Sequence, residues 1–162
     1  MDQGTDDLLA RAHEILASVG FDPDRSVLTR RQAEVLVLRE RDVAQRTIAE
    51  ALGTSRANVS SVESTARENL AKARETVALA DAIRAPVRIR IDPGVPLIDV
   101  PERVYAAADA ADTKVAASAP TLQKRVTEQA GEAVADGQVT ASLFVAVAAD
   151  GSVTIRHADD DR

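Results

Sequence analysis

The sequence predicts an α+β protein: a helical N-terminal region with a helix-turn-helix and a long helix, followed by a small βαβαββ domain. Two observations support this class. Apolar residues recur at helical spacing before residue 85, and the stretch 54–85 contains no Gly or Pro. After Pro86, the residues Val87–Ile91 alternate instead, as they do in a half-buried strand.

The first predicted helix covers residues 6–19 and ends at Gly20. One side of it is apolar, and Asp and Arg lie opposite; the apolar side comprises Leu8, Leu9, Ala12, Ile15, Leu16 and Val19. Because the polar side is acidic, we expect this helix to pack on the protein rather than attach to a membrane. We assign residues 1–26 to an N-terminal helical extension.

A supporting helix is predicted for residues 28–39. Thr29 is its expected N-cap, and Gln32 completes a capping box three residues later. Together with two later apolar positions it should form a compact three-helix core, consisting of Val35, Leu36, Leu38, Ile48 and Val62.

Residues 45–64 have the pattern of a DNA-binding helix-turn-helix. Apolar residues face the expected helix crossing at Ile48, Leu52, Val59 and Val62. Ala49 is small enough for the close contact, and Gly53 stands where the turn needs a positive φ. Thr54 and Ser55 can cap the second helix. A plain helical hairpin is the alternative interpretation.

The outer face of the second helix is small, hydrogen-bonding and free of acid until Glu63. Such a face suits close entry into a major groove, whereas a merely solvated face would favour better helix formers. We predict Arg56 and Ser61 as base readers with Ala57 and Ser60 beside them. Phosphate contacts are expected from Gln45, Arg46, Thr47 and Thr54. The predicted DNA-binding set also includes Ser55, at the helix start, and Asn58, at the edge of the face.

The continuous run Gly53–Ser60, followed by Ala66–Asn69 and Lys72–Arg74, resembles the Tfx family of archaeal DNA-binding transcriptional regulators. The resemblance covers about residues 27–83, and the run at 98–101 looks like a landmark of the family's C-terminal domain. It implies promoter binding and transcriptional control, and leaves the role of the C-terminal domain undefined. The first 26 residues have no counterpart in it.

The second helix of the motif is predicted to continue to about residue 85. Its apolar stripe, rich in Ala, consists of Val62, Ala66, Leu70, Ala73, Val77 and Ala80. The stripe can pack within the chain or form the seam of a homodimer. We favour the dimer, because helix-turn-helix proteins gain affinity and palindromic specificity by pairing half-sites. The DNA-binding domain, with this helix, is assigned to residues 27–84.

Residues 85–158 are assigned to the α+β domain. We expect a strand at 87–91, a helix at 101–112, a short strand at 114–118 and a helix at 121–136 closed by Gly137. Strands at 139–148 and 152–156 would form a hairpin around Asp150-Gly151. The acidic tail is assigned to residues 159–162. A second domain of this kind often senses a ligand or mediates assembly, so an unidentified ligand is a further candidate partner.

Composition argues against several classes of protein. The chain has no Cys, no long apolar run and no basic, apolar leader, so we expect a cytoplasmic protein without disulfides or a membrane span. The net charge is −6, which argues against nucleic acid binding as an average. Residues 28–84, however, carry 10 Lys+Arg against 8 Asp+Glu. The 17 Arg, 3 Lys and 16 Asp are typical of halophilic proteins, for which screening leaves more of the recognition to hydrogen bonds.

Two function classes remain. The first is a sequence-specific transcription regulator that binds double-stranded promoter DNA as a homodimer. The second is a protein-interaction adaptor that contacts the transcription machinery through a helix-turn-helix scaffold. An enzyme is disfavoured, because no nucleophile with a His partner and no phosphate-binding loop is present. His13 and His157 lie in different segments, and turn or surface roles explain Asp92, Asp99 and Asp109, so we expect no metal and no cofactor.

Overall fold

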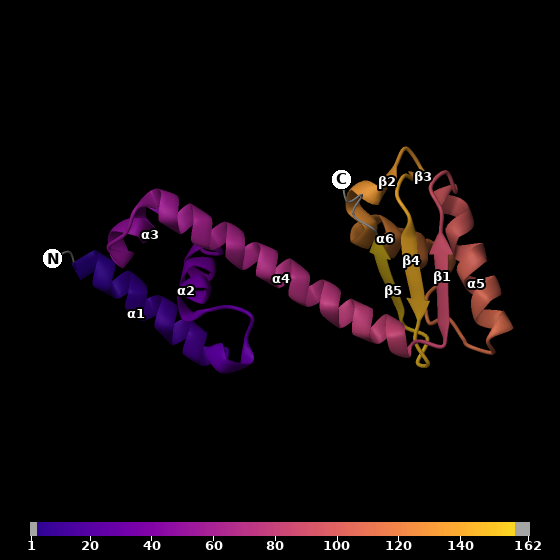
Figure 1. Ribbon diagram of the computed structural model, residues 1–162, viewed down its shortest axis with the longest axis horizontal. Helices are drawn as coiled ribbons and strands as arrows, with labels where there is room; N and C mark the ends of the chain where they lie inside the picture. The colour runs from indigo at the N-terminus through magenta and orange to yellow at the C-terminus, as the bar shows by residue number, and fades with distance from the viewer. Residues whose placement is uncertain (1–2, 158–162) are drawn as a thin grey trace. The chain divides into compact units, whose positions relative to one another are not determined.

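A computed structural model describes residues 3–157 of the chain. The chain forms two compact units, and the first ends at Arg74 while the second begins at Glu75. The boundary falls inside one long helix, α4 (Figure 1). The predicted acidic tail at 159–162 lies outside the described residues. No helix in the described part is both long and apolar enough to cross a membrane.

The first unit is helical. It contains α1 (Gln3–Ser18), α2 (Arg30–Arg39), α3 (Gln45–Leu52) and the first part of α4 (Arg56–Arg84), with a short 3-10 turn at Pro23–Arg25. The capping box predicted at the start of α2 is present: the Thr29 side chain accepts from the Gln32 amide, and the Gln32 side chain accepts from the Thr29 amide. The bounds of these helices agree with the predicted ranges to within a few residues.

The core of this unit joins all four helices. It consists of Ala12, Val35, Leu38, Ile48, Ala49 and Val59, with Leu8, Val37, Val43, Leu52 and Val62 partly buried around it. The apolar side of α1 packs on α2 and α3, as its acidic outer face led us to expect. Leu36 is also buried, but it lies outside this cluster. The N-terminal helix is therefore an integral part of the unit.

The second unit contains the end of α4 and an α+β arrangement. Its elements are β1 (Val87–Ile91), α5 (Val100–Ala110), α6 (Ala119–Ala130), β2 (Val134–Ala135), β3 (Gln138–Val139), β4 (Leu143–Val147) and β5 (Val153–His157). Strands β1, β4 and β5 form an antiparallel sheet in the order β1-β4-β5, and β2 and β3 form a separate hairpin. The predicted α+β class is confirmed.

One face of the three-stranded sheet is buried against α5 and α6. Alternate residues of β1 point into this core, where Val87 and Ile91 pack with Val104 of α5 and with Leu122 and Val126 of α6. The intervening residues Arg88 and Arg90 are exposed. The sheet therefore has a covered face and an arginine-bearing face.

Three predicted elements of this unit are wrong in detail. Residues 114–118 form no strand: the Ala116 amide donates to the Gly151 carbonyl at 2.9 Å, a single bond that fixes a loop on the β4–β5 turn. The predicted helix 121–136 ends at Ala130, because Gly131 takes φ 51 and a 3-10 turn, Gly131–Ala133, follows. The predicted strand 139–148 is interrupted between β3 and β4.

The turn at Asp136-Gly137 explains why the predicted helix 121–136 was too long. Both residues have positive φ, 51 and 74, as a tight hairpin turn between β2 and β3 requires. This dipeptide is the same hairpin signal that correctly identified the turn at Asp150-Gly151. The helical periodicity before it concealed the signal.

The approach of the 114–116 segment to Gly151 generates a stability prediction. Gly151 (φ 84) and Gly94 (φ 90) both lie in the left-handed region, but only at Gly151 would a Cβ meet backbone, at 2.6 Å from the Lys114 oxygen. We expect Gly94→Ala to lower the free energy of unfolding by about 1 kcal/mol, because alanine is strained at a positive φ. Gly151→Ala should lower the free energy of unfolding by about 1–3 kcal/mol more, because the added methyl group would overlap the backbone at Lys114. Urea unfolding of both variants measures the difference. Equal losses of unfolding free energy would mean that the loop at 114–116 can move to accommodate the added methyl group.

Candidate nucleic-acid interface

The turn between α3 and α4 has the geometry that the sequence predicts. Gly53 has φ 63, and the Thr54 amide donates to the Ala49 carbonyl at 2.9 Å, closing the end of α3. No atom lies within 4 Å of a Cβ built on Gly53, so its backbone conformation rather than space favours glycine. Ile48 and Ala49 are buried at the crossing with Val59. The two helices therefore meet as a helix-turn-helix requires.

The start of α4 is held by three polar side chains. Ser55 Oγ accepts from the Asn58 amide at 3.1 Å and caps the helix, as predicted. Asn58 Nδ2 donates to Thr54 Oγ1 at 2.9 Å, so both side chains brace the turn. This arrangement gives Asn58 a structural role, which the sequence alone left open.

The remaining predicted residues divide by exposure. Arg46 and Thr47 of α3 are exposed, and Arg46 Nε lies 3.3 Å from Glu50 Oε1. The exposed residues of the first two turns of α4 are Arg56, Ala57, Asn58, Ser60 and Ser61. Among the described residues, the Arg56 side chain forms no hydrogen bond and no ion pair. Gln45 differs from the others: it is half-buried and its amide donates to Glu63 Oε2 at 3.0 Å.

Glu63 connects the helices of this unit. Its carboxylate is buried and accepts from Arg39 Nε of α2 at 3.0 Å, from Gln45 of α3, and from Arg67 Nη2 of α4 at 2.9 Å. Arg39 also donates to the Val43 carbonyl at 2.9 Å, which fixes the loop between α2 and α3. One buried acid thus sets the positions of the supporting helix and both helices of the motif.

The electrostatic balance at Glu63 favours the ionised form. Burial opposes ionisation, yet the hydrogen bonds from Gln45 and the two arginines hold the pKa of the Glu63 carboxyl below its usual value. The same contact raises the pKa of the Arg67 guanidinium. The nearest acid on α4 therefore stays charged while facing inward, away from the exposed serines.

Sequence reasoning missed this network. The spacing of Val59, Glu63 and Ala66 on the buried side of α4 was the available signal, together with Arg67 one turn after Glu63. A second link, between His13 Nε2 and the buried Glu34 Oε1 at 2.7 Å, joins α1 to α2. Within residues 3–157, no group of His and acidic residues is placed to hold a metal ion.

Comparisons with known proteins agree with this geometry. Residues 73–155 match the family described as "DNA-binding protein, TFX, C-term", and residues 26–72 match "Sigma-70, region 4". The chain belongs to the Tfx family of DNA-binding proteins. Members of the Tfx family are DNA-binding transcriptional regulators rather than enzymes. The resemblance seen in the run Gly53–Ser60 is confirmed.

Individual Tfx relatives cover nearly the whole chain. A candidate transcriptional regulatory protein of Haloarcula marismortui is 48% identical over 149 residues, which is 92% of this chain and 94% of that protein. Another, of Methanocaldococcus jannaschii, is 34% identical and covers 80% of this chain and 95% of its own length. DNA-binding protein Tfx of Methanothermobacter thermautotrophicus is 31% identical, with coverage of 81% and 95%.

The Glu63 network generates a pH prediction. The folded-state pKa lies below the ordinary value of 4.5, so the stabilisation is complete above about pH 4.5 and is lost as the pH falls through the folded pKa. Glu63→Gln should lower the free energy of unfolding at neutral pH by about 1–3 kcal/mol, because the side chains of Arg39, Gln45 and Arg67 lose a buried, charged acceptor. The loss relative to wild type should shrink below pH 4.5.

The matched control is Glu68→Gln, which removes an exposed acid from the same helix. Chemical unfolding of both variants at pH 7 and at pH 3–4 tests the prediction. If Glu68→Gln destabilises as much, or if the Glu63→Gln deficit is independent of pH, the assignment of Glu63 as the charged link between the helices is wrong.

Proposed function

We propose that this Tfx protein is a sequence-specific transcription regulator that inserts the start of α4 into the major groove of promoter DNA as a homodimer. The observation that carries the proposal is the outward face of the first two turns of α4. Val59 and Glu63 are buried there, whereas Arg56, Ala57, Ser60 and Ser61 are exposed, as is Asn58, whose side chain is bonded to Thr54. A narrow, small and polar face of this kind can approach base edges closely.

Each exposed side chain matches a known kind of base contact. The Arg56 guanidinium, which is unpaired among the described residues, can donate two parallel hydrogen bonds to guanine. Ser60 and Ser61 can donate or accept at base edges or phosphates, and the Ala57 methyl can touch a thymine methyl. Arg46 and Thr47 of α3 are exposed and suit phosphate contacts, whereas the Gln45 amide already donates one of its two N–H groups to Glu63.

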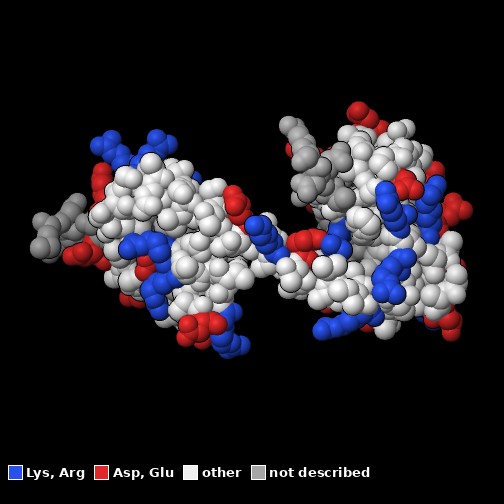
Figure 2. All heavy atoms as spheres, viewed as in Figure 1, with Lys and Arg blue, Asp and Glu red and all other residues white. Residues whose placement is uncertain are grey.

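The acidic composition is less of an obstacle than the net charge suggests. Glu34 and Glu63 are buried and paired with His13, Arg39 and Arg67, so two acids of the region 28–84 are withdrawn from the surface. On the face visible in Figure 2, basic and acidic side chains are interspersed over both units. Such a surface favours recognition by hydrogen bonding and shape, with a shallow dependence of affinity on salt.

The exposed part of the α4 stripe supports the homodimer. Ala66 is fully buried and Val62 partly buried within the first unit, so this part of the stripe packs within the chain. Val77, in the second unit, remains 62% exposed. Burying such a side chain against a second copy contributes about 1–2 kcal/mol per subunit. A dimer also places two recognition helices on half-sites about 10 base pairs apart.

Genome-wide DNA occupancy, measured in the salt of the native cytoplasm, tests the regulator proposal. Wild type should give discrete promoter peaks that share an inverted repeat. Arg56→Ala and Ser61→Ala should lose them, because one bidentate base contact contributes about 1–3 kcal/mol of discrimination. Arg84→Ala, at the other end of the same helix, removes the same charge and should keep the peaks. No enrichment for wild type would favour the adaptor that contacts the transcription machinery.

Sedimentation equilibrium tests the dimer separately. Val77→Asp places a charge in the proposed seam and should weaken self-association at least about tenfold, since an unpaired buried charge is costly. Ala71→Asp adds the same charge at an exposed position of α4 outside the stripe and should associate like wild type. A monomeric wild type at micromolar concentration, or equal weakening by both variants, would place the pairing surface elsewhere or exclude it.

A further inference from the structure

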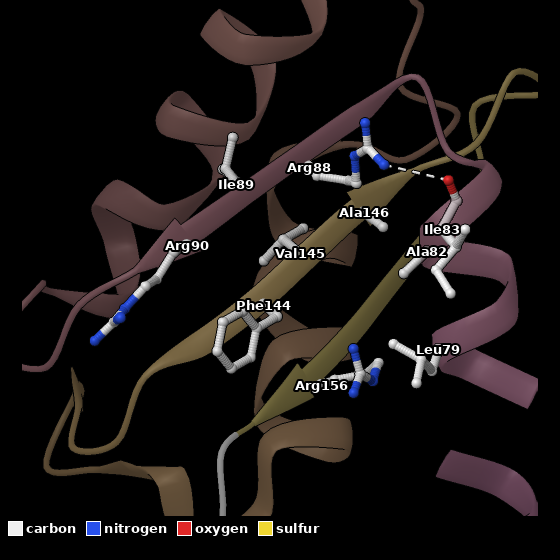
Figure 3. Close-up of a pocket in the computed structure, with 10 residues that line it drawn as sticks. All are labelled: Leu79, Ala82, Ile83, Arg88, Ile89, Arg90, Phe144, Val145, Ala146 and Arg156. Atoms are coloured by element: carbon white, nitrogen blue, oxygen red, sulfur yellow. Dashed lines mark hydrogen bonds between the residues drawn. The ribbon is translucent and has the colours of Figure 1, made fainter. Parts of the chain in front are cut away.

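The second unit contains a groove on the arginine-bearing face of its sheet, remote from the proposed DNA-contacting side chains in sequence. The groove measures about 330 Å³. Figure 3 shows its lining, which comes from β1, β4 and β5 together with the C-terminal end of α4; the lining residues used below are Leu79, Ile83, Arg88, Arg90, Phe144 and Arg156.

The strand register brings an aromatic ring between two guanidinium groups. Arg90 of β1 lies directly opposite Phe144 of β4, and Phe144 lies opposite Arg156 of β5. Directly opposed residues of antiparallel strands are near neighbours on one face. Phe144 is 39% exposed, although the whole chain contains only two Phe and one Tyr. An aromatic platform flanked by cations therefore faces solvent.

Apolar side chains complete one wall of the groove. Leu79 and Ile83 project from the end of α4, with Arg156 between Leu79 and Phe144 in Figure 3, and both are exposed, at 43% and 66%. Ala146, across the sheet from Arg88, is by contrast buried. The groove thus has an apolar wall and floor that nothing in the described chain covers completely.

The charge of the groove is positive. None of its lining residues is acidic, and three are arginines. Arg90 Nε pairs with Asp92 Oδ1 at 2.9 Å, and Arg156 Nε donates to Glu75 Oε1 at 2.7 Å. Arg88 Nη1 donates to the Ile83 carbonyl at 3.2 Å, near the end of α4. Three arginines against two partner carboxylates leave one net positive charge.

The arginines keep capacity for a further acceptor. Each guanidinium has five N–H donors, and the bonds above use only some of them. The Arg90–Asp92 pair is exposed on both sides, at 61% and 71%, and exposed ion pairs contribute only about 0–1 kcal/mol. The Arg156 side chain is only 19% exposed, so its pair with Glu75 is less open to solvent. An incoming anion can therefore share or replace Asp92 at Arg90 at little cost.

We propose that this groove binds a small organic carboxylate with an apolar, preferably aromatic, body. The planar guanidinium fork matches a carboxylate in two-point geometry, and the body can stack on Phe144 against Leu79 and Ile83. The single net positive charge suits a monoanion better than a polyphosphate. The volume lies at the small end of ligand pockets, which fits a compact molecule. A second copy of the chain fits less well, since it would bring a second set of arginines to this face.

Titration of the full-length protein with phenylacetate, followed by amide NMR shifts and calorimetry, tests the proposal. Phenylacetate should bind and shift the resonances of β1 and β4. Acetate, which lacks the ring, and phenylacetamide, which lacks the charge, should each bind at least about tenfold more weakly, since a hydrogen bond to a charged group contributes about 1.5–3 kcal/mol. Absence of phenylacetate binding, or equal binding of phenylacetamide, would overturn the proposal.

Substitutions inside and outside the groove test whether phenylacetate binds there. Arg90→Gln and Phe144→Leu should each weaken phenylacetate binding about tenfold, and both positions are exposed enough for the fold to persist. Arg103→Gln removes the same charge from an exposed position of α5 outside the groove and should bind like wild type. Equal weakening by Arg103→Gln would mean a non-specific charge effect. Arg56→Ala should retain full phenylacetate binding, so failure of the DNA-binding proposal and failure of this one are distinguishable.

Discussion

The helix-turn-helix unit depends on one buried carboxylate. Glu63 accepts hydrogen bonds from a residue of each of the other elements around it, Arg39 of α2 and Gln45 of α3, and from Arg67 on its own helix. Apolar contacts alone would hold these short helices together but tolerate sliding, since they are not directional. A buried charge accepts only a geometry that satisfies it, so it specifies how the helices cross.

This constraint also shapes the surface that we propose for DNA recognition. With the Glu63 carboxylate buried, the exposed side of the first two turns of α4 presents small or polar side chains and Arg56. The turn is braced by hydrogen bonds among Thr54, Ser55 and Asn58, which order the start of the helix before any partner binds. A preordered helix start loses less entropy on binding than a flexible one.

The second unit follows a different plan. Its sheet buries one face against α5 and α6 and leaves the other bearing arginines and Phe144, partly lined by the end of α4 (Figures 1 and 3). Among the glycines of this unit, only Gly151 is closely approached, because the loop at 114–116 passes directly over it. The surface that we propose for base contacts and the groove that we propose for an organic anion therefore belong to different units.

The sequence by itself determined the local features: the capping box at Thr29, the left-handed turn at Gly53, the hairpin at Asp150-Gly151 and the outward face of α4. Each depends on residues close together in the chain, whose spacing is readable directly. Tertiary structure alone decided which distant residues meet. The pairing of Arg39 with Glu63, the loop resting on Gly151, and the alignment of Arg90, Phe144 and Arg156 across three strands all join segments far apart in sequence. Packing and strand register set such contacts, and neither is encoded in local periodicity.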